Sequence, residues 1–400
     1  MRRGSSCWPS DPSSTDVRTL IDAPFLSAVD QVAREEKLLV REPSRALVGA
    51  IQEVSAAYNA LGRDERARRP STALPDALSA RLHFFLPRDV GKAYEAARDL
   101  MPRLVQGACV RAVDVGAGLG ASALGLAMAV RDLRPDVTLA LTLIDDDRAA
   151  MAIAEKLLVR LFPEVAAAAR FLSEPLSAFS PQGDVDLVLA SNVLCELERG
   201  TELNLRADRL AALLHRWTRG LAPDGHLVII EPALKSTARA LQAQRARLIA
   251  GGFSIVAPCT HLKACPLLVD EGDWCHEDRA ISLPSALIPI ARAAGLHYEG
   301  LTFSYLIVSR ASLPVRTARG RVVAPPRDAK GKRGLSLCHD GGDAARGTLS
   351  EFERLERHRG PSRDAWVAAE RGSVLSMNPW PEPGRIDGEV SIARLENGER

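Results

Sequence analysis

The 400-residue chain is poor in aromatic residues and has no long apolar run. Aromatic side chains make up 4% of it, which disfavours an RNA-binding surface built on base stacking. No stretch of 18 or more apolar residues occurs, so no membrane-spanning helix is expected. Lys and Arg number 52 against 50 Asp and Glu, so the chain is not a polycation and only the distribution of charge can be informative.

A signal peptide and a disulfide framework are also lacking. The N-terminus has two arginines but no apolar core behind them, so we expect a disordered lead over residues 1–20 and a cytoplasmic protein. Seven cysteines, an odd number, favour a metal site or buried thiols over disulfides. The apolar content of 46% is enough for one α/β domain of about 200 residues with additions.

What is present is a helical pattern followed by alternating strand and helix patterns. Apolar residues recur at three- and four-residue spacing over residues 21–105, which predicts a helical cap. Strand-like and helix-like segments then alternate over residues 106–310. This alternation predicts a doubly wound, mostly parallel α/β sheet of the Rossmann-like type, with Tyr305–Val308 as a candidate antiparallel strand.

The remainder of the chain differs from this core. A cysteine-containing loop, residues 257–276, is inserted in the sheet domain, and residues 311–345 form a basic extension with two strand-like pieces. Residues 346–400 read as a charged, loosely ordered tail with one helix candidate, Leu349–Arg357. We expect this tail to add no further folded layer.

The stretch Ala112–Gly120, AVDVGAGLG, organises the predicted sheet domain. An apolar strand ends in Gly116, Gly118 and Gly120, and a helix pattern follows. Glycines let the backbone approach a ligand, and a helix N-terminus behind such a turn presents free N–H groups. Dinucleotide-binding folds and S-adenosylmethionine (SAM) methyltransferases both use such a turn. The acid at Asp114, two residues before the first glycine, favours SAM.

Polar residues at the ends of two further strands complete the predicted cofactor site. Asp145 follows the second strand and is placed for the ribose hydroxyls, whereas Asp114 is placed near the ammonium group of the methionine part. Asn192 follows the fourth strand and borders the crevice, so it is the candidate residue beside the reacting methyl group. Asp146 and Asp147 are interpreted as a solvated helix N-terminus.

The methyl acceptor is less clear from these residues. Amino methylation of a base commonly uses N-P-P-Y after the fourth strand, and the chain has Ser-Asn-Val-Leu there, with Asn192 second. Methylation of cytosine C5 needs a cysteine nucleophile, and Cys195 is near. We interpret Cys195 as a buried, inert thiol, the more common state of a free cysteine.

Three cysteines within 17 residues, Cys259, Cys265 and Cys275, mark the inserted loop, and Cys338 lies far downstream. The spacing C-x5-C-x9-C lacks the close pair typical of structural zinc. It favours an iron–sulfur cluster, with zinc as the alternative metal. His261 and His276 could substitute as ligands, but we interpret them as exposed loop histidines.

These motifs together resemble the Rsm-type ribosomal small-subunit methyltransferase-like family. The resemblance rests on the glycine turn, on Asp186–Leu197, on Ile230–Ala233, and on the A-P-C-x5-C-P element beginning at Ala257, and it runs from about Leu78 to Gly342. It implies SAM binding, association with the small ribosomal subunit and its rRNA, and a [4Fe-4S] cluster. By motif position the cluster ligands would be Cys259, Cys265, Cys275 and Cys338.

Three functions remain open. The first is a SAM-dependent methyltransferase that modifies rRNA of the small subunit, with eight cations against one acid in Arg310–Arg333 contacting RNA phosphates. The second is a non-catalytic RNA-binding assembly factor that binds SAM and the cluster. The third is a small-molecule methyltransferase with no ribosome contact. The basic run could instead be a solvated, flexible linker.

Overall fold

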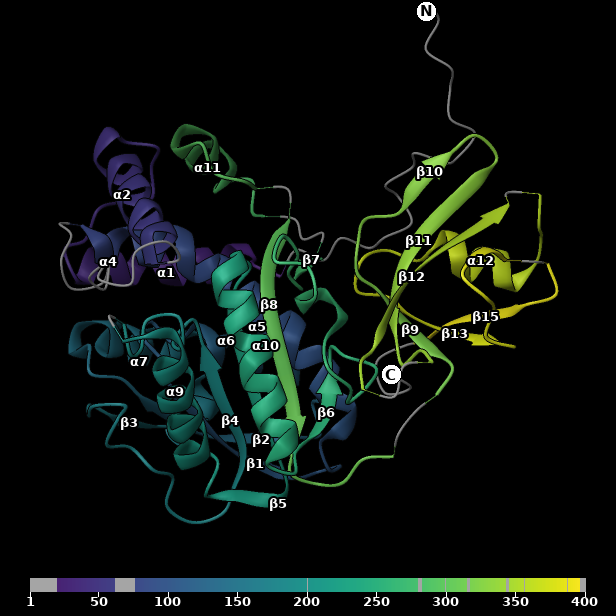
Figure 1. Cartoon of the computed structure of the whole chain (residues 1–400). Helices are drawn as coiled ribbons and strands as arrows, with labels where there is room; N and C mark the ends of the chain where they lie inside the picture. The colour runs from purple at the N-terminus through teal and green to yellow at the C-terminus, as the bar shows by residue number, and fades with distance from the viewer. Residues whose placement is uncertain are drawn as a thin grey trace, which may run out of the picture.

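A computed structural model describes most of the chain (Figure 1). It covers residues 20–61, 76–199, 201–279, 283–298, 300–314, 317–342, 345–355, 357–386 and 388–395. The disordered lead expected over residues 1–20 therefore lies almost wholly outside the described residues. In the described part, no helix is long and apolar enough to cross a membrane.

The central sheet has the predicted doubly wound order, β3-β2-β1-β4-β5-β8-β6, with β7 paired to β8. Strands β1 to β5 pair in parallel, and β8 runs antiparallel to β5 and β6, as predicted for Tyr305–Val308. The strands are β1 Cys109–Val115, β2 Thr138–Ile144, β3 Arg170–Leu172, β4 Val185–Ser191, β5 Leu221–Pro232, β6 Ser254–Ala257, β7 Glu277–Arg279 and β8 Leu301–Ser309.

Helices cover both faces of this sheet. Alternate strand residues enter different apolar clusters: Ala112 faces the cluster that includes α6 and α7, whereas Val113 faces the cluster that includes α9 and α10. The strand order reverses between β1 and β4, which is where doubly wound folds bind ligands. These helices are α6 Ala121–Leu133, α7 Arg148–Leu161, α8 Pro163–Ala167, α9 Leu203–Trp217 and α10 Lys235–Ala250.

The first N-terminal helices form the predicted cap over the carboxyl ends of the strands, and the last long one, α5 Leu86–Leu100, continues from the cap along the face of the sheet beside α6 (Figure 1). The N-terminal elements are α1 Ala23–Glu35, α2 Arg45–Leu61, α4 Ala77–Ala80, the π-helical segment η2 Arg81–Phe85, α5 and the 3-10 turn η3 Met101–Arg103. A helix from much later in the chain, α11 Ile288–Ala294, packs with α2 in one apolar cluster. The cap is therefore not a single sequence segment.

A second sheet spans residues 319–395, and its first part overlaps the two strand-like pieces predicted in the basic extension. Its strands beyond residue 346 lie where the sequence predicted a loosely ordered tail. That prediction is wrong, and so is the helix over Leu349–Arg357, which is strand β12. Its buried positions alternate and include the polar residues Ser350 and Arg354, so hydrophobic spacing alone misleads. The elements are β9 Arg319–Val322, β10 Arg327–Ala329, β11 Lys332–His339, β12 Thr348–Leu355, α12 Pro361–Val367, β13 Val374–Asn378, β14 Gly384–Ile386 and β15 Ser391–Leu395.

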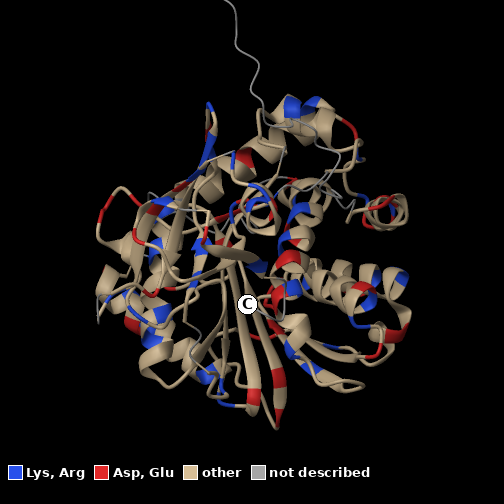
Figure 2. Cartoon of the chain, turned by 90° about the vertical axis from the view of Figure 1, so that its right-hand side faces the viewer, with Lys and Arg blue, Asp and Glu red and all other residues tan. Residues whose placement is uncertain are grey.

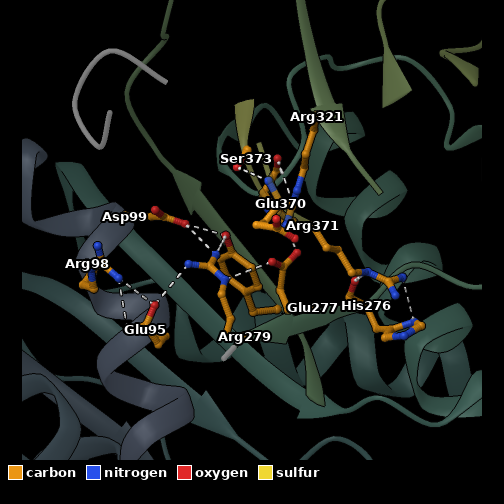
Figure 3. Close-up of polar contacts among 12 residues, drawn as sticks. Glu95, Arg98, Asp99, His276, Glu277, Arg279, Arg321, Glu370, Arg371 and Ser373 are labelled. Carbon is orange, nitrogen blue, oxygen red and sulfur yellow. Dashed lines mark hydrogen bonds and ion pairs between the residues drawn. The ribbon is translucent and has the colours of Figure 1, made fainter. Parts of the chain in front are cut away.

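A buried ion-pair network joins the two sheets to helix α5 (Figure 3). Arg279 on β7 donates to Glu277 at 3.0 Å and to Glu95 on α5 at 3.2 Å. Glu277 also pairs with Arg321 on β9, so one carboxylate bridges the two sheets. The hydroxyl of Tyr305 on β8 donates to Asp99 on α5. The second sheet is thus held to the first by charges withdrawn from solvent.

Candidate cofactor site and cysteine loop

A cavity of about 760 Å³ opens at the carboxyl ends of β1, β2 and β4. Four of the predicted cofactor residues line it, namely Gly116, Gly118, Asp145 and Asn192. Its other walls come from the cap helices α2 and α5 and the segment η2. The cavity lies at the switch point of the sheet, where such folds hold their ligands.

The glycine turn has the geometry that its sequence predicts. Gly116 and Gly118 adopt φ values of +75° and +51°, a region that favours glycine. A side chain at Gly116 would also place its Cβ 2.6 Å from Cγ2 of Val193, which follows β4. The loop is therefore packed against the end of β4 with its backbone exposed to the cavity.

Asp114 lies beneath the turn, outside the cavity wall. Its Oδ2 accepts from the backbone N of Ala123 at 3.1 Å, and Ser122 donates a further hydrogen bond. Among the described residues nothing donates to Oδ1, although that atom is buried. Burial raises the pKa of Asp114 to about 7. A cationic group in the cavity above would favour the charged form of this carboxyl.

Asp145 holds the end of β2 to the glycine turn. Its Oδ2 accepts from the backbone N of Gly118 at 2.8 Å, and its Oδ1 accepts from the backbone N of Asp147 at 2.9 Å. Burial raises its pKa above the usual range. Asp147 caps α7 by accepting from the backbone N of Ala150 at 3.0 Å, so it has the helix-terminus role expected of it.

A buried glutamate that the sequence did not single out shapes the turn after β4. Glu231, at the end of β5, accepts from the backbone N of Leu194 and Cys195 at 2.9 and 3.0 Å. Asn192 adopts φ +55° within this turn. The Cys195 thiol is buried and donates to the carbonyl of Asn192 at 3.3 Å, and burial raises its pKa well above the usual value. In the sequence, Glu231 could have been found as a charged residue at the end of an apolar strand, because such residues are rarely buried without partners.

The cap contributes two further side chains that sequence reasoning missed. Tyr58 on α2 and Arg81 on η2 both line the cavity. Arg81 pairs with Asp147 at 3.0 Å, and Tyr58 packs edge-on against Phe85 with ring centroids 5.7 Å apart. These residues precede the glycine turn by more than 30 positions, so no local motif connects them to it.

The structure brings the three loop cysteines and Cys338 on β11 into one neighbourhood. Burial first, and then negative charge on the other three cysteines, raises the pKa of Cys338. The pKa of Cys265 is raised to about 11 and that of Cys275 to about 12, both mainly by burial. The loop is also tied to the second sheet, because the backbone N of Ala264 donates to Ala345 and Gly347 donates back to Ala264.

Arginines surround these thiols. The Arg245 guanidinium, buried on α10, donates to the carbonyls of His261 and Lys263 and to the thiol of Cys259. Arg321 and Arg371 lower the pKa of Cys275, against the larger effect of burial. In the described part of the chain, no three His, Cys, Asp or Glu side chains are arranged to hold a metal ion.

The two loop histidines differ from the prediction that they are exposed. His261 is 5% exposed, and its Nε2 lies 3.4 Å from the sulfur of Cys338. That prediction is wrong for His261, because the loop folds back onto β11 and encloses the ring. His276 is half-buried and stacks on Trp274 with ring centroids 5.6 Å apart.

The basic run does not form the continuous RNA-facing stripe that its composition suggested. Arg321 and Arg333 are buried, and the latter pairs with Asp328 and Glu370. Further pairs join Arg327 to Glu351 and Lys332 to Glu353. Figure 2 shows both signs of charge interspersed over the face that carries the second sheet. Four of its eight cations, Arg321, Arg327, Lys332 and Arg333, are paired with acids, so strands β9 to β11 are neither a flexible linker nor an unopposed cationic strip. Arg316 lies outside the described residues.

Comparison with known families agrees with this architecture. A family model described as mitochondrial small ribosomal subunit Rsm22 matches residues 91–366. The chain belongs to the Rsm22 family. The match begins within α5 and continues beyond Gly342, where the sequence resemblance ended, so it adds β12 and most of α12 to the strands β9 to β11 that the resemblance already covered. A search of curated proteins finds no match.

Solved structures with related folds are remote. The pyocyanin biosynthetic protein PhzM is 16% identical with a TM-score of 0.31, over 59% of this chain and 58% of that protein. A methyltransferase from Geobacter sulfurreducens is 18% identical with a TM-score of 0.30, over 58% and 83% of the two chains. The plantazolicin methyltransferase BpumL, solved with S-adenosylhomocysteine (SAH), is 12% identical with a TM-score of 0.39, over 64% and 99%. These values give the three structures no weight in assigning an activity.

Proposed function

We propose that the chain binds SAM in the switch-point cavity and acts on the small ribosomal subunit, as an rRNA methyltransferase or as an assembly factor. The observation that carries SAM binding is the joint position of Gly116, Gly118 and Asp145 around a 760 Å³ cavity at the switch point. Asp114, beneath the turn and outside the cavity wall, would favour a ligand with an ammonium group through its charge and not through direct contact.

The residues of the chain would act mainly by positioning. The glycine turn would admit the methionine part close to the backbone, and Asp145 would accept hydrogen bonds from the ribose hydroxyls. Asn192 would border the methyl group, since Glu231 fixes the turn that carries it. When bound, SAM supplies the electrophilic methyl group. Transfer in line then needs an acceptor held at the right distance and angle.

We propose in addition that Cys259, Cys265, Cys275 and Cys338 hold a [4Fe-4S] cluster. Four thiols in one neighbourhood are the donor set that such clusters use. The spacing C-x5-C-x9-C lacks the close cysteine pair typical of structural zinc, which favours the cluster over a single zinc ion. Arg245, Arg321 and Arg371 would stabilise an anionic cluster. The cluster would link the loop of the first sheet to β11 of the second.

The non-catalytic assembly factor is the second candidate, and Cys195 supports it. A methyltransferase acting on cytosine C5 needs a reactive thiolate, whereas this thiol is buried with its pKa raised. The family description, which names the mitochondrial small ribosomal subunit, is compatible with either role.

Single-turnover methyl transfer from labelled SAM to immature small subunits separates the two candidates. The test variant is Asp145→Asn, and the control is Asp208→Asn, which removes the same charge at an exposed position of α9 outside the cavity. Transfer by the wild type and the control, but not by Asp145→Asn, supports the enzyme. Co-sedimentation with subunits without transfer supports the assembly factor. If the protein neither transfers a methyl group nor co-sediments with subunits, a role on the ribosome is contradicted and small-molecule methylation remains.

A further inference from the structure

Arg81 is a cap residue whose side chain lies over the glycine turn. It belongs to the π-helical segment η2, a kind of distortion that is frequent at functional sites. Its Nη2 lies 3.0 Å from the position that a Cβ of Gly118 would occupy, so the guanidinium lies directly over the turn. The side chain is 13% exposed, and it lines the cavity.

In the guanidinium of Arg81, Nη1 is held by a hydrogen bond and Nη2 is available to a ligand. Nη1 donates to Oδ2 of Asp147 at 3.0 Å, which sets the orientation of the planar group. Among the described residues, none accepts a hydrogen bond from Nη2. Burial alone would lower the pKa of Arg81, but Tyr58 and Asp147 hold it above the usual value. Arg81 therefore presents a permanent charge and an unused donor to the cavity.

The other charges of the cavity wall do not duplicate Arg81. Lys92 is paired with Asp89 at 2.8 Å, and Arg148 is exposed in the first turn of α7. The remaining charged wall residues are acids, among them Asp145 and Glu196. A ligand with cationic groups and one carboxylate would meet several acids on the wall and a single oriented cation over the glycine turn.

We propose that Arg81 binds the carboxylate of the amino-acid part of SAM. This inference rests on the proposed SAM binding and adds the residue that distinguishes SAM from adenosine ligands without a carboxylate. A charge-assisted hydrogen bond from an oriented guanidinium is among the stronger polar contacts in proteins. The helical cap thereby contributes directly to cofactor recognition, so the cofactor site is not complete within the sheet domain.

Calorimetric titration with SAM and with decarboxylated SAM tests the assignment, because the two ligands differ only in the carboxylate. Arg81→Gln should weaken SAM binding by at least about tenfold, equivalent to about 1.4 kcal/mol, and leave decarboxylated SAM unchanged. Arg81→Lys, which keeps the charge, should lose less than Arg81→Gln, again for SAM only. The control Arg131→Gln, which removes an exposed arginine of α6 outside the cavity, should change neither affinity.

Each other outcome has a distinct meaning. An equal loss for both ligands in Arg81→Gln would overturn the assignment and leave Arg81 as the structural partner of Asp147. Unchanged affinities in that variant would overturn it as well. Wild-type protein that binds neither ligand would contradict the proposed function itself. Thermal unfolding of Arg81→Gln and Arg81→Lys, compared with the wild type, identifies any loss of fold.

Discussion

Glu277 should be the carboxylate on which the union of the two sheets depends most. It is 2% exposed and pairs with Arg279 on its own strand and with Arg321 on β9 (Figure 3). Glu277→Gln keeps the shape but leaves two buried guanidinium groups with less compensating charge. Removing one partner of a buried ion pair costs about 3–5 kcal/mol. We expect a loss of that size in the free energy of unfolding.

Urea denaturation followed by tryptophan fluorescence measures this loss. The matched control is Glu353→Gln, whose partner Lys332 lies at 2.8 Å in a pair with 39% and 38% of the side chains exposed. Exposed pairs contribute about 0–1 kcal/mol, so the control should change little. Adding Arg321→Met to Glu277→Gln should recover part of the loss, because it removes the buried guanidinium that has lost its partner. Equal, small losses in the free energy of unfolding of Glu277→Gln and Glu353→Gln would refute the role of Glu277. Iron analysis of each sample shows whether a variant has also lost a cluster.

Three further predictions follow from the site. Burial raises the pKa of Glu231 from 4.5 to about 7, so the stability that its protonated form contributes is present below about pH 4.5 and is lost as the pH rises to about 7. The free energy of unfolding should fall by on the order of 3 kcal/mol over this range, and Glu231→Gln should remove most of that fall. The same pH dependence in the wild type and the variant would contradict this prediction. Cys338→Ser should abolish the broad visible absorbance and the iron content of anaerobically purified protein, whereas Cys109→Ser, at an exposed cysteine, should not. If both variants keep the absorbance of the wild type, Cys338 is not a cluster ligand. Gly116→Ala should destabilise by about 1–3 kcal/mol through its φ and its clash with Val193, and adding Val193→Ala should restore part of this in thermal unfolding.

The cofactor end of the sheet was predictable because its determinants are local. A strand, a glycine turn and a helix follow one another around Gly116, and parallel strands bring Asp145 and Asn192 to the same edge. The cap residues Tyr58 and Arg81 were not predictable, since they reach the cavity only through helix packing. Nothing in the pattern of a surface helix distinguishes a side chain aimed at a cavity from one in solvent.

Strands β12 to β15 of the second sheet escaped prediction for a different reason, whereas strand-like pieces overlapping β9 and β11 were predicted. The strands of this sheet bury polar and charged side chains such as Arg354 and Ser350, so the apolar alternation that signals a strand is weak. The cations of the basic run likewise looked like a nucleic-acid surface because their partners, among them Glu277, Glu351 and Glu370, are distant in sequence. The local composition of the run identifies its cations, but it does not identify the carboxylates elsewhere in the chain that pair with them.

The most direct test of the central claim is calorimetric titration of the purified full-length protein with SAM. The wild type and Asp208→Asn, at an exposed position outside the cavity, should bind one SAM per chain with the same affinity. Asp145→Asn should bind at least about tenfold more weakly, because it loses a charged acceptor beside the glycine turn. Absence of SAM binding by the wild type, or equal affinity in all three proteins, would contradict the account of the cavity as a SAM site.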